Sequence, residues 1–223
     1  MPSQSRRSRR PTHIRILIVG CGLIARCLAR PLSWHSSKIS GVTFEIHAID
    51  GDETKARSIA DDMKRESPSL ATSAIPEYLV AANIARYLMD DDIVLVCTSN
   101  RATRKLISDH AEMLKSVFVI AGACYWTDGL IQVHVRRGRK NTTLPLANIY
   151  HPEVTNPTDR IPGDEDETGK KEKLPQSVVA YNAVAAQMLV AFCRVQCCDS
   201  TEPLPCEIYI DAFNGRVMPR SRT

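Results

Sequence analysis

The chain has 223 residues, of which 43% are hydrophobic and 24% charged, and its formal net charge is +4. This composition is ordinary for a globular protein, and the length suffices for one sizeable domain. The eight cysteines fall partly inside strand and helix patterns, which argues against a disulfide framework and favours free thiols in a reducing cytoplasm. We recognise no signal peptide and no apolar run long enough to span a bilayer, and we expect no membrane partner.

Residues 1–12 form a tail rich in serine and arginine, in which Arg6, Arg7, Arg9 and Arg10 lie close together. A basic arm of this kind can contact nucleic-acid phosphates, but a solvated terminus is the commoner outcome of such a composition. We expect a disordered tail and no specific nucleic-acid binding. The remainder, 13–223, is expected to form a single domain.

The first element of that domain is an apolar run over 16–19, which predicts a buried parallel strand. The run leads directly into Gly20, and apolar residues recur at helical spacing from Leu23 onward. In this context Gly20 allows a tight turn, Gly22 lets a phosphate approach the backbone, and Ala25 lets the helix pack closely on the strand. The helix N-terminus would then offer free N–H groups to an anion. The alternative is a glycine turn that binds no ligand.

Strands and helices alternate through the first half of the chain. After a polar loop over 33–41, we predict strands over 42–49, 69–75, 93–97 and 117–120, and helices over 54–66, 77–89 and 101–115. This alternation predicts a parallel sheet with helices on both faces. Right-handed crossovers would bring the loops after Val19, Ile49 and Cys97 to one edge of the sheet, where a ligand should bind.

The second half changes to antiparallel patterns. We predict a strand over 129–136 with a turn over 138–141, a mobile segment without apolar residues over 163–173, a buried helix over 178–195 and a hairpin over 207–218. The expected fold class is therefore α/β, a doubly wound Rossmann-like parallel sheet extended by antiparallel strands in the C-terminal half.

Asp50 ends the second predicted strand, about 30 residues after Gly22, where dinucleotide folds place a carboxylate that binds ribose hydroxyls. A carboxylate repels a 2′-phosphate, so NADP is disfavoured, but this position does not distinguish NAD from ATP. The alternative role of Asp50 is to cap the following turn. An NAD-dependent oxidoreductase therefore remains one hypothesis, although we find no second domain with an acid/base pair for hydride transfer.

Several short segments occur in a characteristic order: Asp50-Gly51-Asp52, Lys55-Ala56, CTSN at 97–100, RATR at 101–104, TDGLIQV at 127–133, YHPE at 150–153 and the late buried helix. Together they resemble the ThiF/MoeB family, bacterial relatives of the ubiquitin-activating enzymes, from about Ile14 to the C-terminus. The resemblance implies that the chain binds ATP and magnesium and adenylates the C-terminal carboxylate of a small ubiquitin-like protein. It also implies a homo- or heterodimer, with the C-terminal half as the expected interface.

Mapped onto this sequence, the resemblance implies that Gly20 and Gly22 line the nucleotide phosphates, that Asp50 holds the ribose, and that Asp52 lies nearby. Lys55 would reach the phosphates and act as the catalytic residue, where a cation offsets the charge of the departing pyrophosphate. The alternative for Lys55 is an exposed lysine in a first helical turn. The full set of predicted nucleotide-binding residues is Gly20, Cys21, Gly22, Leu23, Ile24, Asp50, Asp52, Ser99 and Asn100.

Two departures from the family pattern bear on activity. The Asn-Leu-x-Arg-Gln segment that follows the second Asp in the family is missing between Asp52 and Lys55, and Ser99 stands where the family has an Asp on the magnesium side. Serine is a poor replacement for a carboxylate facing a hard dication. We therefore expect weak or absent adenylation, and a catalytically inactive partner or scaffold protein is the alternative function.

The cysteines are further candidates for a chemical role. Cys124 ends the fifth strand and is a candidate acyl acceptor, provided that a nearby cation lowers its pKa. The late cysteines lack the two C-x-x-C pairs typical of zinc sites, so we predict no metal site among Cys193, Cys197, Cys198 and Cys206.

Overall fold

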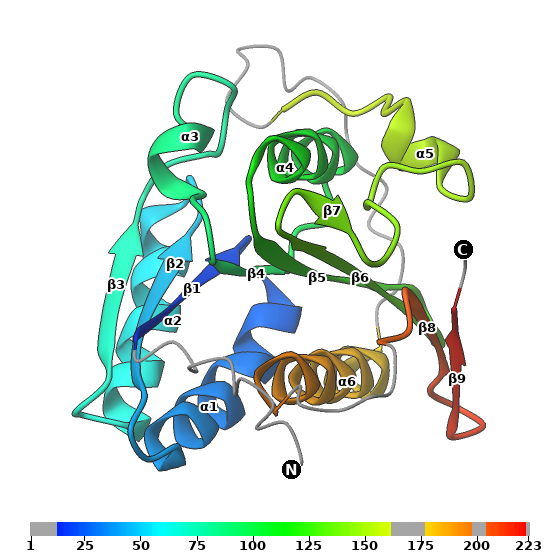
Figure 1. The fold of residues 1–223 in the computed structure, drawn as a ribbon. Coiled ribbons are helices and arrows are strands. Elements are labelled where there is room, and N and C mark those ends of the chain that lie inside the picture. Colours follow the sequence, from blue (N-terminus) through cyan, green and yellow to red (C-terminus); the bar gives the residue numbers. More distant parts are fainter. Residues whose placement is uncertain (1–12, 162–176, 198–203, 222–223) are drawn as a thin grey trace, which may run out of the picture.

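One sheet with helices on both faces makes up the fold (Figure 1). The computed structural model describes residues 13–161, 177–197 and 204–221. The predicted tail 1–12, the predicted mobile segment 163–173 and Cys198 lie outside the described residues.

The sheet has nine strands in the order β3-β2-β1-β4-β5-β6-β8-β9, with β7 paired to β6. Strand pairs from β3 to β5 are parallel, and those from β5 to β9 are antiparallel. The predicted fold class, a Rossmann-like parallel sheet extended by antiparallel strands, is confirmed. The strand bounds are β1 His13–Val19, β2 Thr43–Ile49, β3 Ala71–Ile75, β4 Ile93–Val96, β5 Val117–Cys124, β6 Asp128–Arg137, β7 Lys140–Asn141, β8 Glu207–Asp211 and β9 Arg216–Arg220.

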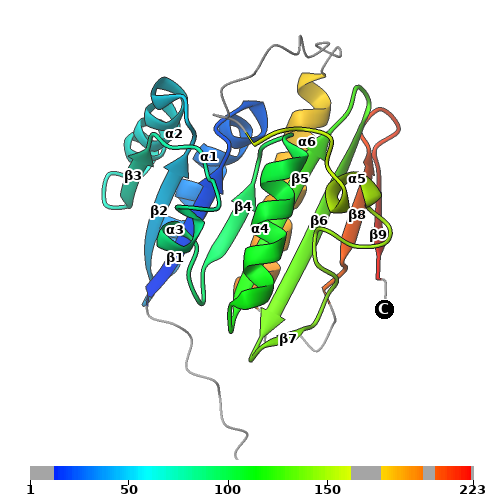
Figure 2. The same ribbon diagram turned by 90° about the horizontal axis from the view of Figure 1, so that it is seen from above.

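Helices α1, α2 and α6 cover one face of the sheet, and α3, α4 and α5 cover the other (Figures 1 and 2). Successive residues of β1 supply both cores, since Ile16 and Ile18 pack under α1 while Leu17 and Val19 pack on the opposite side. The helix bounds are α1 Leu23–Lys38, α2 Glu53–Glu66, α3 Ile84–Tyr87, α4 Arg101–Met113, α5 Pro152–Thr155 and α6 Val178–Cys197.

The loops after β1, β2 and β4 meet at one edge, as predicted. Beyond the strand ends, the N–H of Cys97 donates to the carbonyl of Val19 at 2.8 Å, and the N–H of Gly20 donates to the carbonyl of Ile49 at 2.9 Å. These bonds continue the parallel ladder past the strands. They therefore hold the first residues of the three loops in a fixed register.

The predicted loop over 33–41 is wrong for most of its length, because α1 continues to Lys38. Ser33 and Ser36 are buried, and the Ser33 hydroxyl donates to the carbonyl of Met63 in α2 at 2.9 Å. The hydroxyl of Ser67 in turn donates to the carbonyl of Ser33 at 3.2 Å. Ser33 and Ser67 thus bond each other's helices, whereas the buried hydroxyl of Ser36 has no partner among the described residues. A polar composition therefore did not mark solvent exposure.

The predicted helix over 77–89 is also wrong, since only Ile84–Tyr87 is helical. The side-chain oxygen of Asn83 accepts from the N–H of Val80 at 2.9 Å, and its amide donates to the carbonyl of Tyr78 at 2.9 Å. An asparagine that bonds neighbouring backbone groups in this way competes with helix formation. The segment before α3 is consequently a loop ordered by one side chain.

The late apolar helix is α6, and it was correctly predicted to pack on the sheet, where it contacts α1, β5 and β6. Its exposure is larger than predicted, since Val178, Val179 and Val190 are 70%, 57% and 47% exposed. The prediction that no apolar run could span a bilayer is wrong by length and composition, because the segment Val178–Gln196 has 19 residues and a mean hydropathy of 1.6. In the structure, 44% of this segment is buried. Its contacts with the sheet are those of a core helix.

Phe192 of α6 has no exposed surface and lies in the core shared with α1. Truncation to alanine leaves a cavity that the surrounding helices cannot close, so Phe192→Ala should lower the free energy of unfolding by about 3–5 kcal/mol. Urea denaturation measures the change. Val190→Ala, at a position 47% exposed on the same helix, is the control and should change stability by less than about 0.5 kcal/mol. Similar losses for both variants would contradict the packing of α6 described above.

His134 of β6 is fully buried, and its Nε2 has no hydrogen-bond partner within the described residues. Burial lowers the pKa of His134, so the folded chain keeps it neutral while the unfolded chain protonates it below about pH 6.5. The stability associated with His134 should therefore be complete above pH 6.5 and should fall as the pH decreases from there. In urea denaturation between pH 7.5 and 5, His134→Gln should show a weaker acid destabilisation than wild type. An unchanged pH dependence would refute this account.

Candidate functional site

The turn between β1 and α1 needs glycine at its first position. Gly20 has φ of +87°, and a Cβ added there would lie 2.7 Å from the backbone nitrogen of Thr98. The β1 turn and the loop after β4 are thus in direct backbone contact. The interpretation of Gly20 as a tight-turn residue is consistent with this geometry.

Asp50 links the first two loops through its carboxylate. Oδ2 accepts from the N–H of Cys21 at 2.8 Å, and Oδ1 accepts from the N–H of Asp52 at 2.9 Å. The carboxylate therefore faces the β1 turn, as the ribose-binding prediction requires, and it also caps the turn that follows β2. The two roles that the sequence left open are compatible, because each carboxylate oxygen can accept more than one hydrogen bond.

The remaining predicted phosphate-binding backbone lies at the start of α1. Gly22 is the N-cap residue and is exposed, and no side chain among the described residues caps this helix end. The first amides of a helix have no intrahelical acceptor, so those of Leu23 and Ile24 are suited to an anion. Cys21 differs, since its N–H is bonded to Asp50 and its side chain is fully buried. Burial raises the pKa of the Cys21 thiol, which makes this cysteine unreactive.

Asp52 and Lys55 form a pair at the start of α2. Asp52 is the N-cap residue and accepts from the N–H of Lys55 at 3.2 Å, while the Lys55 ammonium lies 3.0 Å from the Asp52 carboxylate. The hydrogen bond to Asp52 raises the pKa of Lys55, so the side chain is a cation at neutral pH. Lys55 is about half exposed and must leave or share its bond with Asp52 to reach a ligand.

Ser99 and Asn100 follow β4, and the structure gives them different environments. Ser99 is exposed at the predicted edge. The Asn100 side chain caps α4, accepting from the N–H of Thr103 at 2.8 Å and donating to the carbonyl of Arg160 at 2.8 Å. Asp159 adds a second cap by accepting from the N–H of Arg101 at 2.8 Å. A carboxylate from a distant part of the chain thus binds the first backbone amide of α4, two residues after Ser99, which the sequence did not predict.

Arg104 is a buried cation. The sequence placed it in the RATR segment at 101–104 but predicted no role for it. It is 4% exposed, and its guanidinium donates to the carbonyl of Thr98 at 2.9 Å and to the carbonyl of Gly122. Thr98 lies in the loop after β4, and Gly122 lies near the end of β5. Arg104 therefore joins the β4 loop to β5, just as Asp50 joins the loops after β1 and β2. An arginine on the inward face of an amphipathic helix was the available signal.

Tyr78 is the second residue that the sequence did not indicate. A Cβ added to Gly51 would lie 2.3 Å from two ring carbons of Tyr78, so the ring packs directly on the Gly51 backbone. Tyr78 remains 42% exposed. An aromatic ring therefore stands beside Asp50, at the end of the neighbouring strand β3.

The residues around this edge do not form a ready-made metal site. Within 13–161, 177–197 and 204–221, no group of three or more histidine, cysteine or acidic side chains could hold a metal ion. The predicted departure at Ser99 leaves a hydroxyl at this position, and Asn100 is engaged in the helix cap. Magnesium prefers carboxylate oxygens and phosphates. These residues therefore do not fit a preformed magnesium site.

Cys124 does not have the environment of an acyl acceptor. Burial raises the pKa of its thiol to about 11, and its Sγ donates to the carbonyl of Tyr125 at 3.4 Å. The neutral thiol is a weak nucleophile.

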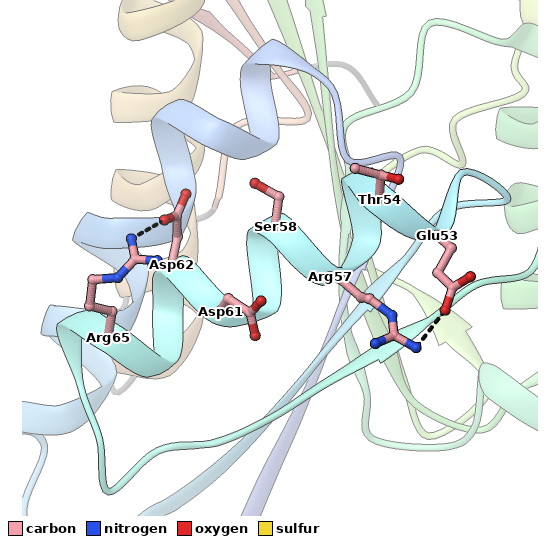
Figure 3. A pocket seen from close by; sticks show the side chains of 7 residues that line it. All are labelled: Glu53, Thr54, Arg57, Ser58, Asp61, Asp62 and Arg65. Carbon is pink, nitrogen blue, oxygen red and sulfur yellow. Dashed lines mark hydrogen bonds and ion pairs between the residues drawn. The ribbon is translucent and has the colours of Figure 1, made fainter.

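Two surface hollows lie along α2. One of about 440 Å³ is lined by Glu53, Thr54, Arg57, Ser58, Asp61, Asp62 and Arg65. Figure 3 shows that ion pairs Glu53–Arg57 and Asp62–Arg65 run along it. The second, of about 300 Å³, lies between α2 and β3. Exposed ion pairs of this kind are typical of a solvated helix face, so we assign no chemistry to it.

Asp50→Asn tests the shared carboxylate. An amide has one acceptor oxygen, so either Cys21 or Asp52 would face an NH₂ group in place of its acceptor. The free energy of unfolding should fall by about 1–3 kcal/mol. Urea denaturation measures the loss, and Asp61→Asn on the outer face of α2 is the matched control. Equal stabilities for the two variants would show that Asp50 does not hold the two loops together.

No protein-family model and no curated protein matches the sequence. Solved structures do match: E. coli MccB in a structure with ATP has a TM-score of 0.66 and 14% identity, covering 93% of this chain and 63% of that one. The microcin C7 biosynthetic enzyme MccB in complex with N-formylated MccA matches with a TM-score of 0.67 and 16% identity, over 93% of this chain and 64% of that chain.

PaaA matches with a TM-score of 0.64 and 13% identity, over 93% of this chain and 72% of that chain. The chain thus spans somewhat less than two thirds of the MccB chains it matches. Identities this low establish a shared fold. The chain has the fold of MccB in a divergent form, which is the fold that the resemblance to the ThiF/MoeB family implied.

Proposed function

We propose that this chain binds ATP at the carboxyl edge of its sheet and uses it to adenylate a carboxylate. The observation that carries the proposal is the Asp50 carboxylate, fixed by the N–H groups of Cys21 and Asp52 beside the uncapped start of α1. The shared fold with MccB, which has been crystallised with ATP, supports this choice over NAD.

In this proposal the phosphates bind at the N-terminus of α1. The amides of Leu23 and Ile24 and the positive end of the helix dipole favour an anion there. The ribose hydroxyls donate to Asp50, whose oxygens each keep a lone pair beyond their amide bond. Lys55 turns from Asp52 to the phosphates, a movement that its half-exposed position allows.

The chemical step is a substitution at phosphorus. An oxygen of the substrate carboxylate attacks the α-phosphorus of ATP, a new O–P bond forms, and the bond to the pyrophosphate oxygen breaks. The product is an acyl adenylate, and pyrophosphate leaves with its electron pair. The Lys55 ammonium offsets the negative charge that develops on the departing group.

The proposed partner is the C-terminal carboxylate of a peptide or small ubiquitin-like protein. MccB structures that contain MccA support a peptide substrate for this fold. A homo- or heterodimer through the antiparallel half of the sheet is part of the same proposal. The outermost strand β9 is exposed along its whole length, which leaves that edge open to a partner.

A second candidate function is nucleotide binding without catalysis, in complex with an active partner. Ser99 supplies a hydroxyl where the family pattern has a carboxylate, and the Asn100 side chain is held in the cap of α4. Both observations weaken the side of the site that would face the metal-bound phosphates.

Isothermal titration with ATP tests the binding proposal. Wild type should bind ATP, and Asp50→Ala should weaken binding about 10-fold or more. The variant removes the acceptor of the Cys21 and Asp52 amides and the proposed acceptor of the ribose hydroxyls. Asp61→Asn is the control and should bind as wild type. Failure of wild type to bind ATP would overturn both candidate functions.

Exchange of labelled pyrophosphate into ATP, in the presence of peptides with a free C-terminal carboxylate, separates the two candidates. Exchange that is lost in Lys55→Ala supports adenylation. Binding of ATP without exchange for any peptide supports the non-catalytic partner.

A further inference from the structure

We propose that Tyr78 is the residue that stacks on the nucleobase and so adds affinity for ligands that carry a base. The inference rests on the proposed nucleotide function and names a residue for the base. It starts from the position of the Tyr78 ring against Gly51, next to the Asp50 carboxylate.

The strand order gives the direction in which a bound nucleotide extends. Along the carboxyl edge, β1, β2 and β3 are consecutive neighbours. The anion-binding turn follows β1, and the proposed ribose carboxylate Asp50 follows β2. A nucleotide that lies along this edge, with its phosphates at the first position and its sugar at the second, brings its base to the loop after β3. Tyr78 belongs to that loop.

The contact with Gly51 determines where the ring lies. Any side chain at this position would meet the ring, because a Cβ would approach its carbons to 2.3 Å. The absence of a side chain at Gly51 therefore lets the ring pack against the backbone next to Asp50. Tyr78 as a residue stays 42% exposed, which leaves surface for a ligand. Aromatic rings of this kind stack on bases with little dependence on base identity.

The loop that carries Tyr78 is ordered before any ligand binds. Asn83 donates to the carbonyl of Tyr78 at 2.9 Å and to the Glu77 carboxylate at 3.1 Å, and it accepts from the N–H of Val80 at 2.9 Å. Glu77 also pairs with Arg86 in the short helix α3. Preorganisation reduces the entropy lost when a ligand binds. Asn83 is thus a positioning residue for Tyr78.

A comparison of ATP with inorganic tripolyphosphate, which has no base, tests the proposal by isothermal titration. Tyr78→Ala should weaken ATP binding about 10-fold and leave tripolyphosphate binding unchanged, since only ATP has a base to stack. Tyr78→Phe keeps the ring and should bind both ligands as wild type. Tyr150→Ala is the matched control, because Tyr150 is 43% exposed and lies by α5.

The remaining outcomes separate this inference from the proposed function. If Tyr78→Ala binds ATP as tightly as wild type, the ring does not contact the base. If it binds ATP more tightly, the ring obstructs the site, and if it loses ATP and tripolyphosphate equally, Tyr78 is structural. Each of these results overturns the stacking role and leaves the proposed ATP site intact. Wild type that binds no ATP overturns the proposed function and this inference with it.

Discussion

The Asp50 carboxylate is the interaction on which the candidate site depends. It accepts N–H groups from the turn after β1 and from the turn after β2, so one side chain fixes the relative position of two loops. Neither amide has an intrahelical acceptor nearby, and a buried N–H without a partner is costly. Each oxygen of the same carboxylate can accept a further hydrogen bond. Structural cap and candidate ligand group are therefore combined in one residue.

Arg104 has the corresponding role on the other side of the first strand. Its guanidinium binds one carbonyl in the loop after β4 and one near the end of β5, and it is almost fully buried. The edge is consequently stabilised by the Asp50 carboxylate, which accepts from N–H groups, and by the Arg104 guanidinium, which donates to carbonyls. Backbone groups at loop starts need such partners because the regular ladder ends there. Gly20 contacts Thr98 between Asp50 and Arg104, and a side chain at position 20 would prevent this contact.

Where the sequence predictions were wrong, side chains bonded the backbone in ways that periodicity cannot reveal. Ser33 and Ser36 looked like solvent-facing loop residues, yet α1 continues through them because they are buried and Ser33 bonds α2. The segment before α3 has helical spacing, yet Asn83 binds the backbone of Val80 and Tyr78 and prevents a helix. Asp159 is a third case, since a residue far away in the chain caps α4 two residues after Ser99.

The sequence alone determined the alternation of strands and helices, the parallel-to-antiparallel change, the glycine turn and the acidic end of β2. Each of these follows from local pattern, because a period of two or 3.6 and a glycine at a turn are properties of neighbouring residues. Only the tertiary structure decided that Asp50 faces Cys21, that Tyr78 covers Gly51 and that Asn100 is held by Arg160. Those contacts join residues from different loops, and side-chain hydrogen bonds and ring packing across loops leave no periodic trace in a single chain.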